Sequence, residues 1–251
     1  IPVRTELGRE MRRFFCAREG MVLVDADYSQ IELRVLAHIA NDKNMIEAFK
    51  NNEDIHAITA SQVFGIPLDM VTPIMRSRAK AVNFGIVYGI GAFSLAKDIG
   101  VSNKEASTYI KNYLAHYSGV DEYMKNVVEK AKQDGYVETM FGRRRYLPEL
   151  TSGKHMLRAF GERVARNMPI QGTAADIIKI AMVKVNERIK KEGLRARLIL
   201  QVHDELIVEA PQDESKIVAK LLQEEMEHAV KLDVPLTADA PIGKTWYDAK
   251  G

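Results

Sequence analysis

The sequence predicts an α+β protein in which a large helical lobe is inserted into a lobe built around a β-sheet. Two groups of apolar runs rich in β-branched residues, one near each end of the chain, predict the strands of that sheet. Between them, from about Met45 to Gln133, the pattern is typical of consecutive helices. With 251 residues, 46% of them hydrophobic, the chain can bury a core as one large domain or as two interlocked lobes.

Local signals place the first elements in order. The apolar run MVLVDADY predicts a strand that ends near Asp27, and a helix follows it. In the helical lobe, Asp54 is expected to begin one helix, and Ser102 with Glu105 forms a capping box for another. Gly135 is expected to end the last of these helices, because glycine readily adopts the left-handed conformation of a C-terminal cap.

The remainder of the chain leads back to the sheet lobe. A short hairpin is expected around Phe141 and Gly142, followed by two helical stretches between residues 156 and 192 that Pro169 interrupts. The segment LILQVHDELIVEA predicts two strands joined at a charged tip. An acidic amphipathic helix near 213–232 and a last extended segment complete the chain.

One predicted helix carries an ordered stripe of cations and aromatic rings. Four side chains recur at four-residue spacing in RSRAKAVNFGIVYG: Arg76, Lys80, Phe84 and Tyr88. Residues four apart share a helix face, and Thr72 with Pro73 provides a helix start. Cations suit phosphates and flat rings suit a sugar and base, so the stripe indicates nucleotide binding. The alternative is an ordinary amphipathic helix with scattered cations.

Carboxylates lie at two rigid positions that are distant in the sequence. Asp27 ends the first strand, and Asp204 lies with His203 and Glu205 at the tip of the late hairpin. Adjacent carboxylates repel each other unless a divalent cation lies between them, and magnesium leaves positions for water and phosphates. Two such ions can clamp the oxygens of a phosphoryl displacement. Asp25 shares the strand face of Asp27, so spacing alone leaves the choice between them open.

These segments together resemble a known family. DYSQIELR, the Arg-x3-Lys-x3-Phe-x3-Tyr helix and QVHDE are similar, in order, to the polymerase motifs of family A DNA polymerases, the bacterial DNA polymerase I type. The similarity continues through NMPIQGTAADIIK and PLTADAPIGKTW. It implies an antiparallel-sheet palm with an inserted helical fingers lobe. Residues 1–44 and 156–251 would form the palm, and residues 45–155 the fingers, with the nucleotide helix at 73–90.

The resemblance implies roles for the carboxylates and the triphosphate ligands. Asp27, Asp204 and the carbonyl of Tyr28 would hold two Mg²⁺ ions, for which Mn²⁺ could substitute, with Glu205 in support. The incoming triphosphate would be met by three side chains: His56, Arg76 and Lys80. Lys80 would also give a proton to the departing pyrophosphate.

The resemblance also assigns side chains to the sugar, the base and the duplex. Phe84 would pack on the sugar and Tyr88 would lie near the templating base. Glu32 would crowd the 2′ position, and Gln30 would help to hold the nucleotide. The minor groove of the primer–template would be contacted by four side chains: Arg163, Asn167, Gln171 and His203. Without the resemblance, an ordinary polar helix face would be the favoured interpretation of the four-spaced row from Arg163 to Gln171.

The implied activity is template-directed DNA synthesis, with deoxynucleoside triphosphates and primer–template DNA as partners. Family members carry several hundred further residues before the part that resembles this chain, so we expect the thumb and exonuclease domain to be absent here. The missing N-terminal part would then be a further partner. The alternative is a non-catalytic fragment that binds nucleotide or nucleic acid. A single-subunit RNA polymerase shares the carboxylates, but Glu32 argues against it.

The composition excludes several classes of protein and indicates the cellular compartment. The net charge is +2, so the chain is not a uniformly basic nucleic-acid coat. The one cysteine, Cys16, excludes an internal disulfide and suits a reducing compartment. No apolar run approaches the length of a membrane span and no signal peptide is visible, so we expect no membrane partner and a cytoplasmic location.

Overall fold

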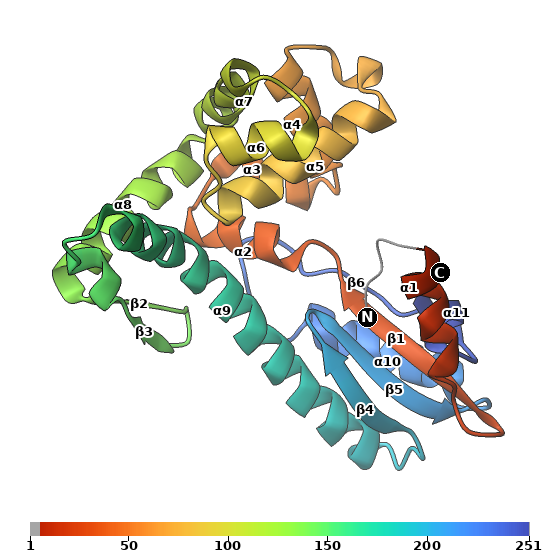
Figure 1. Cartoon of the computed structure of the whole chain (residues 1–251). Coiled ribbons are helices and arrows are strands. Elements are labelled where there is room, and N and C mark those ends of the chain that lie inside the picture. Colours follow the sequence, from red (N-terminus) through yellow and green to blue (C-terminus); the bar gives the residue numbers. More distant parts are fainter. Residues whose placement is uncertain (1–5, 251) are drawn as a thin grey trace. The chain divides into compact units, whose positions relative to one another are not determined.

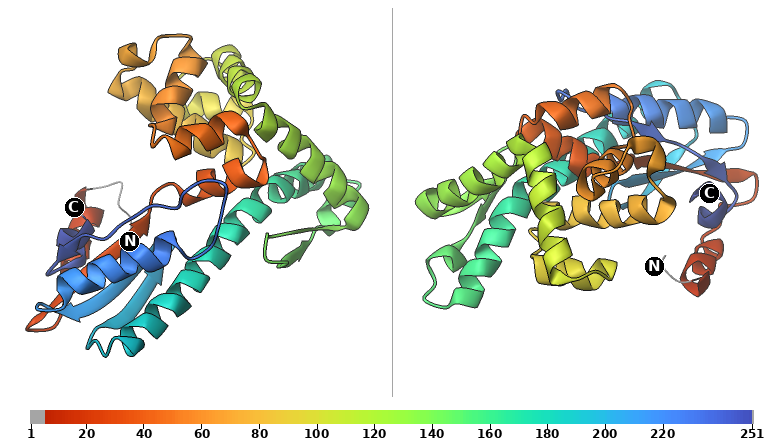
Figure 2. Two further views of the ribbon diagram at one scale, coloured as in Figure 1. Left: turned by 180° about the vertical axis from the view of Figure 1, so that it is seen from behind. Right: turned by 90° about the horizontal axis from the view of Figure 1, so that it is seen from above.

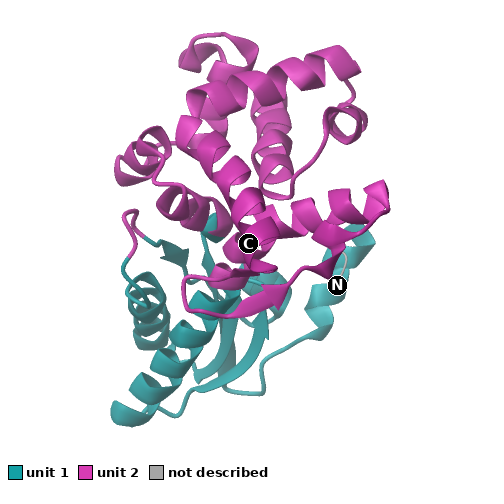
Figure 3. Cartoon of the chain, turned by 90° about the vertical axis from the view of Figure 1, so that its left-hand side faces the viewer, with its two compact units in different colours: residues 1–31, 175–231, 236–251 teal, residues 32–174, 232–235 magenta. Residues whose placement is uncertain are grey.

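The computed structural model describes residues 6–250, which form two compact units (Figures 1 and 3). Unit 1 comprises the described residues up to 31, residues 175–231 and those from 236 onward. Unit 2 comprises residues 32–174 and 232–235. Most of unit 2 is therefore inserted in sequence between two segments of unit 1, which confirms the predicted α+β fold class with an inserted helical lobe.

Unit 1 is built around an antiparallel sheet of order β4-β5-β1-β6, in which β7 also pairs with β1. Its central strand, β1, is almost entirely buried. The strands have these bounds: β1 Met21–Tyr28, β4 Arg197–Val202, β5 Glu205–Pro211, β6 Ala238–Asp239 and β7 Ile242–Gly243. β4 and β5 form the predicted hairpin, with His203 and Asp204 at its tip.

Helices cover the sheet of unit 1. Helix α10, Ser215–Glu227, packs against β1 and β5 (Figure 2), and the Tyr28 hydroxyl donates a 2.6 Å hydrogen bond to the Met226 carbonyl at its end. Helix α11, Trp246–Lys250, packs against β1 and β7 and buries Trp246 beside Leu23 and Ile207. Because successive strand residues face opposite sides, Leu23 shares its face of β1 with Asp25 and Asp27. The chain enters the sheet through α1 Glu6–Glu10 and η1 Met11–Phe14.

Unit 2 is mostly helical, and several of its helices begin or end at the predicted signals. The Asp54 carboxylate caps α4 by accepting from two backbone N–H groups, and Ser102 with Glu105 forms a complete capping box on α7. Gly135 ends α8 with φ 77°. The helices have these bounds: α2 Ile31–Ile39, α3 Lys43–Lys50, α4 Ile55–Phe64, α5 Pro73–Val87, α6 Ala92–Ile99, α7 Asn103–His116 and α8 Ser118–Asp134; the 3₁₀ turn η2, Leu68–Met70, precedes α5.

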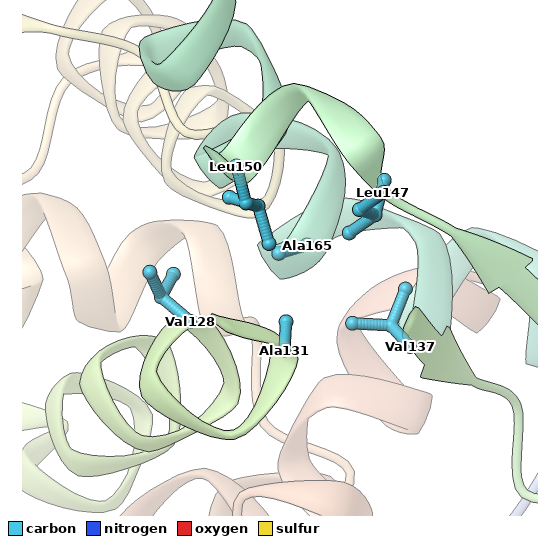
Figure 4. Close-up of a cluster of buried hydrophobic side chains, with 6 residues drawn as sticks. All are labelled: Val128, Ala131, Val137, Leu147, Leu150 and Ala165. Carbon is cyan, nitrogen blue, oxygen red and sulfur yellow. The ribbon is translucent and has the colours of Figure 1, made fainter. Parts of the chain in front are cut away.

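The predicted short hairpin is confirmed as β2 Tyr136–Glu138 paired with β3 Arg144–Tyr146. It leads through η3, Pro148–Thr151, into the long helix α9, His155–Lys191. Where these elements meet α8, they enclose a cluster of six buried apolar side chains (Figure 4): Val128, Ala131, Val137, Leu147, Leu150 and Ala165. Burial of this apolar surface fixes the hairpin and the first half of α9 against α8.

Three expectations about element bounds were wrong. Pro169 does not interrupt α9, because the neighbouring Ala165 and Ile170 are fully buried and their packing outweighs the roughly 3 kcal/mol cost of an internal proline. The nucleotide helix ends at Val87 rather than at residue 90, since Gly89 adopts a left-handed φ of 67°. The last extended segment was expected to complete the chain, but residues 246–250 form helix α11.

The predicted division into segments 1–44, 45–155 and 156–251 stays a prediction, and the units have the bounds given above. Within the described residues, every helix is too short or too polar to cross a membrane.

Candidate active site

The sheet of unit 1 gathers the predicted carboxylates at one end of β1. Asp27 lies directly opposite Glu205 in the pairing of β1 with β5. Asp204 immediately precedes β5, and its carbonyl accepts a 3.2 Å hydrogen bond from the Tyr28 N–H. This backbone bond ties the hairpin tip to the end of β1. Asp27, Tyr28, Asp204 and Glu205 are therefore neighbours in the structure, although β1 and the hairpin are far apart in the sequence.

The carboxyl groups gathered at this end of β1 are costly to ionise. Burial, followed by the charge of Asp27, raises the pKa of Asp204 to about 6. Burial, followed by the charge of Glu205, raises the pKa of Asp25 to about 7. Oδ1 of Asp25 and Oδ1 of Asp27 are buried and accept no hydrogen bond from the described residues. A site with crowded carboxylates and unsatisfied oxygens favours a cation.

The oxygen atoms available here suit a magnesium ion, which needs few protein ligands, better than a metal that several protein side chains must enclose. Within residues 6–250, no group of three or more His, Cys, Asp or Glu side chains is arranged to enclose a metal. Magnesium uses only one or two protein carboxylates together with waters and substrate phosphates, so Asp27 and Asp204, with the Tyr28 carbonyl, stay the expected ligands. Asp25 is fully buried and accepts a hydrogen bond from the Trp246 indole, whereas Asp27 is partly exposed. This difference favours Asp27 over Asp25 as the ligand.

Unit 2 presents the cation and aromatic stripe on helix α5. The Thr72 hydroxyl caps the helix through the Met75 N–H at 3.3 Å, and Pro73 occupies its first turn, as predicted. One face of α5 is buried, whereas Arg76 and Lys80 are exposed. Tyr88 is 44% exposed and stands at the C-cap, one residue beyond the helix.

His56, on the neighbouring helix α4, lies beside the stripe. Its ring centroid is 5.9 Å from that of Phe84, and Lys80 Nζ is 6.0 Å from the Phe84 centroid. Arg76 Nε donates a 2.6 Å hydrogen bond to Asp54 Oδ2 at the start of α4. The structure therefore gathers His56, Arg76, Lys80 and Phe84, as the resemblance implies.

His56 is held neutral in a buried polar network. It is 2% exposed, and Nδ1 lies 2.9 Å from Nδ2 of Asn83. The Thr59 hydroxyl donates to Oδ1 of Asn83 at 3.1 Å. Burial, followed by the charges of Arg76 and Lys80, lowers the pKa of His56 to about 4. At neutral pH the imidazole is therefore a neutral hydrogen-bonding group, and the positive charge beside it comes from Arg76 and Lys80.

The predicted minor-groove row lies on α9. Arg163 and Gln171 are exposed, while the Asn167 amide donates a 3.4 Å hydrogen bond to the carbonyl of Val87, the last residue of α5. The stem of Arg163 also approaches the turn after α5, where a Cβ on Gly89 would lie 3.2 Å from Arg163 Cγ. Two residues of this row thus help to hold the end of α5.

The remaining predicted residues lie at element ends. His203 is exposed at the hairpin tip of unit 1 with a left-handed φ of 51°. Gln30 also has a left-handed φ, 54°, between β1 and α2. Glu32 lies in the first turn of α2.

Three residues of these sites were missed from the sequence. Lys250 Nζ donates to Asp27 Oδ2 at 2.7 Å and also to Glu205 Oε2. The other two are Asp54, which pairs with Arg76, and Asn83, which contacts His56. The only local signal for Lys250 is its position four residues after Trp246, which places both on one face of a helix.

Comparisons with known proteins show the family to which this combination of fold and carboxylates belongs. The model of DNA polymerase family A matches residues 1–248, so the chain belongs to that family. It is similar to DNA polymerase I of Bacillus caldotenax and of Bacillus subtilis, with 55% identity to each over 251 residues. It is 48% identical to the thermostable DNA polymerase I of Thermus aquaticus. Each match spans the whole chain but only 28–30% of the length of these relatives.

Among solved structures, the chain matches the POL domain of Pol1 from M. smegmatis in complex with DNA primer-template and dNTP. The TM-score is 0.95 and the sequence identity 46%, over 100% of this chain and 44% of that one.

Proposed function

We propose that this chain performs template-directed DNA synthesis, transferring a nucleotide from a deoxynucleoside triphosphate to a primer 3′-hydroxyl. The proposal rests chiefly on the backbone bond that ties Asp204 to Tyr28 and so assembles the carboxylates at the end of β1. The match of residues 1–248 to the polymerase family supports it. Primer–template DNA and deoxynucleoside triphosphates are the proposed partners, and the bacterial cytoplasm is the proposed location.

Asp27, Asp204 and the Tyr28 carbonyl would hold magnesium, and Glu205 would support them from the facing strand. Bound magnesium would stabilise the negative charge that develops during phosphoryl transfer. The family membership makes a divalent cation an expected cofactor, and the crowded carboxylate oxygens of β1 and the hairpin fit one.

The side chains of unit 2 would bind and orient the nucleotide. Arg76 and Lys80 supply cations for the triphosphate, and Lys80 can give a proton to the departing pyrophosphate. His56, neutral at pH 7, would add a hydrogen bond to the same phosphates. Phe84 and Tyr88 provide apolar surface for the sugar and the base pair.

Further side chains would select the sugar and hold the duplex. Glu32 would exclude a 2′-hydroxyl, and Gln30 would steady the nucleotide. Along α9 and at the hairpin tip, four donors would contact the minor groove: Arg163, Asn167, Gln171 and His203. Donors aimed at the minor groove test pair geometry with little regard to sequence.

Primer extension with the 251-residue chain, magnesium and four deoxynucleotides tests the proposal. Template-directed extension that Asp204→Ala abolishes is the expected result. Extension by Asp204→Ala at the wild-type rate would overturn the assigned carboxylate role. Glu32→Ala should admit ribonucleotides. Unchanged sugar selectivity would refute the role of Glu32 in excluding a 2′-hydroxyl.

A second candidate is a binding fragment without turnover. The lengths of the relatives support this candidate, because they are more than three times as long as this chain. Such a fragment would bind duplex or nucleotide but release no pyrophosphate. Measuring pyrophosphate release on a correctly folded chain separates the two functions.

A further inference from the structure

Lys250 places a positive charge between two carboxylates of the candidate metal site. Its Nζ donates to Asp27 Oδ2 at 2.7 Å and to Glu205 Oε2. Asp27 and Glu205 lie directly opposite each other on neighbouring antiparallel strands, where like charges destabilise a sheet. The ammonium group therefore offsets a repulsion that the strand register creates.

Helix α11 is anchored so that this contact is built into the fold. Trp246, at its first position, is 5% exposed, and its indole N–H donates a 3.0 Å hydrogen bond to Asp25 Oδ2. The Thr245 hydroxyl donates to Asp248 Oδ2 at 2.7 Å and accepts from the Asp248 N–H at 3.1 Å. The indole bond ties the helix to β1, and the two bonds between Thr245 and Asp248 fix its first turn.

Two further contacts hold α11 close to the strands. A Cβ on Gly243 would lie 2.3 Å from the Ala249 backbone nitrogen, so only glycine permits this approach of β7 to the helix. The guanidinium of Arg12 stacks on the Trp246 ring at 4.7 Å from its centroid. Because Lys250 follows Trp246 by one helical turn, the anchored tryptophan directs it to the same face.

We propose that Lys250 is a built-in counter-cation that competes with a divalent metal ion for Asp27 and thereby sets the metal affinity of the site. Lys250 has this role only if the carboxylates bind a metal ion as proposed above. A divalent ion at Asp27 must displace the ammonium group from Oδ2 or tolerate its repulsion. Either cost weakens metal binding, and removing the lysine charge removes that cost.

Mn²⁺ binding to the whole chain, measured by the loss of the free-ion electron paramagnetic resonance signal, tests this competition without any turnover. Lys250→Met should bind Mn²⁺ about tenfold more tightly than the wild type, equivalent to about 1.4 kcal/mol. Lys250→Arg keeps the charge and should retain wild-type affinity. Lys244→Met is the matched control, because Lys244 is an exposed lysine two residues before Trp246.

Asp204→Ala in the Lys250→Met background locates the ion, since the gained affinity should disappear there. Lys250→Gln provides a second neutral variant, and circular dichroism shows whether each variant is folded. Equal Mn²⁺ affinity in the wild type and both folded neutral variants would overturn the role of Lys250. If Mn²⁺ binding in every chain is indifferent to Asp204→Ala, the proposed metal site itself fails. Both outcomes are read from metal binding alone, so neither requires primer extension.

Discussion

The side-chain amide nitrogen of Asn83 lies 2.9 Å from Nδ1 of His56, inside the buried contact between α4 and α5. An amide NH₂ group can only donate, so Nδ1 accepts and the ring proton resides on Nε2. The Thr59 hydroxyl, which donates to Asn83 Oδ1, orients the amide for this purpose. Asn83 thereby fixes the hydrogen-bonding character of a residue proposed to meet phosphates.

Asn83→Asp should reverse this arrangement. A carboxylate can only accept, so the proton should move to Nδ1 of His56, and the new negative charge should raise the pKa of His56. Nitrogen-15 NMR of the histidine ring distinguishes the two tautomers. A wild-type ring already protonated on Nδ1 would contradict the assignment.

Stability should fall as the pH is lowered through the titration of His56. Above about pH 6.5 the imidazole is neutral in both the folded and unfolded states. Between there and the folded pKa of about 4, the unfolded chain takes up a proton that the folded chain refuses, so acid favours unfolding. The free energy of unfolding should drop by about 2 kcal/mol between pH 7 and pH 5 from this group.

Urea unfolding of the wild type and of His56→Gln at both pH values measures that contribution. The glutamine variant lacks the titrating ring, so its stability should change less over the same range. Parallel pH profiles for the two chains would show that His56 does not titrate as the pKa indicates.

Substitutions of Asp54 should separate the stability contributed by its helix cap from that contributed by its ion pair with Arg76. Oδ1 caps α4 through the His56 and Ala57 N–H groups, and Oδ2 pairs with the half-exposed Arg76. Asp54→Ser keeps a capping oxygen and should lose less than about 1 kcal/mol, because exposed pairs contribute little. Asp54→Ala should lose a further ~1 kcal/mol with the cap.

Asp54→Ser also frees Arg76 from its carboxylate, so a nucleoside triphosphate should bind this variant more tightly at low salt. Calorimetric titration compares it with the wild type. Weaker binding by a stable Asp54→Ser chain would indicate that the pair positions Arg76 rather than competing with phosphate.

Gly85 is required for the turn that follows α5 to fold back. A Cβ at this position would lie 2.6 Å from Cγ2 of Ile90. Isoleucine is β-branched and restricted at χ1, so this methyl group cannot rotate away from the added Cβ. Gly85→Ala should therefore destabilise the chain by about 1–3 kcal/mol, despite the roughly 1 kcal/mol gain in helix propensity. Adding Ile90→Ala should recover part of that loss, which a double-mutant cycle of urea unfolding measures.

The resemblance to family A polymerases also implies that the nucleotide helix swings inward once a correct nucleotide binds, and the same substitution tests this expectation. Gly85→Ala should slow nucleotide incorporation more than it weakens nucleotide binding, because it alters the end of α5 rather than its phosphate ligands. Single-turnover kinetics separates the two effects. Equal losses in both would defeat the idea.

Local signals in the sequence predicted those helix boundaries that are set by residues within four positions of the helix end. The Thr72–Pro73 start of α5, the capping box of Ser102 and Glu105, and the left-handed Gly135 all occur as expected. Each is determined by short-range hydrogen bonds or backbone sterics, which the local sequence contains. The four-residue spacing of Arg76, Lys80 and Phe84 likewise sufficed to place them on one face.

The expectation about Pro169 was wrong because tertiary packing outweighed the local preference of proline. Proline disfavours a helix interior, yet the buried neighbours of Pro169 keep α9 continuous. The terminal helix α11 was missed for the same reason. Its five residues are too few to form a stable helix alone, and burial of Trp246 against the sheet stabilises it.

The sequence by itself determined the family, the helix caps and the identity of the cations, rings and carboxylates available for chemistry. Only the tertiary structure decided that Lys250 reaches Asp27, 223 residues away, and that the Asp204 carbonyl is tied to the Tyr28 N–H. Such contacts depend on strand register and on which helix covers which sheet face. Those features follow from the burial of the whole chain, because no short segment contains both partners of the contact.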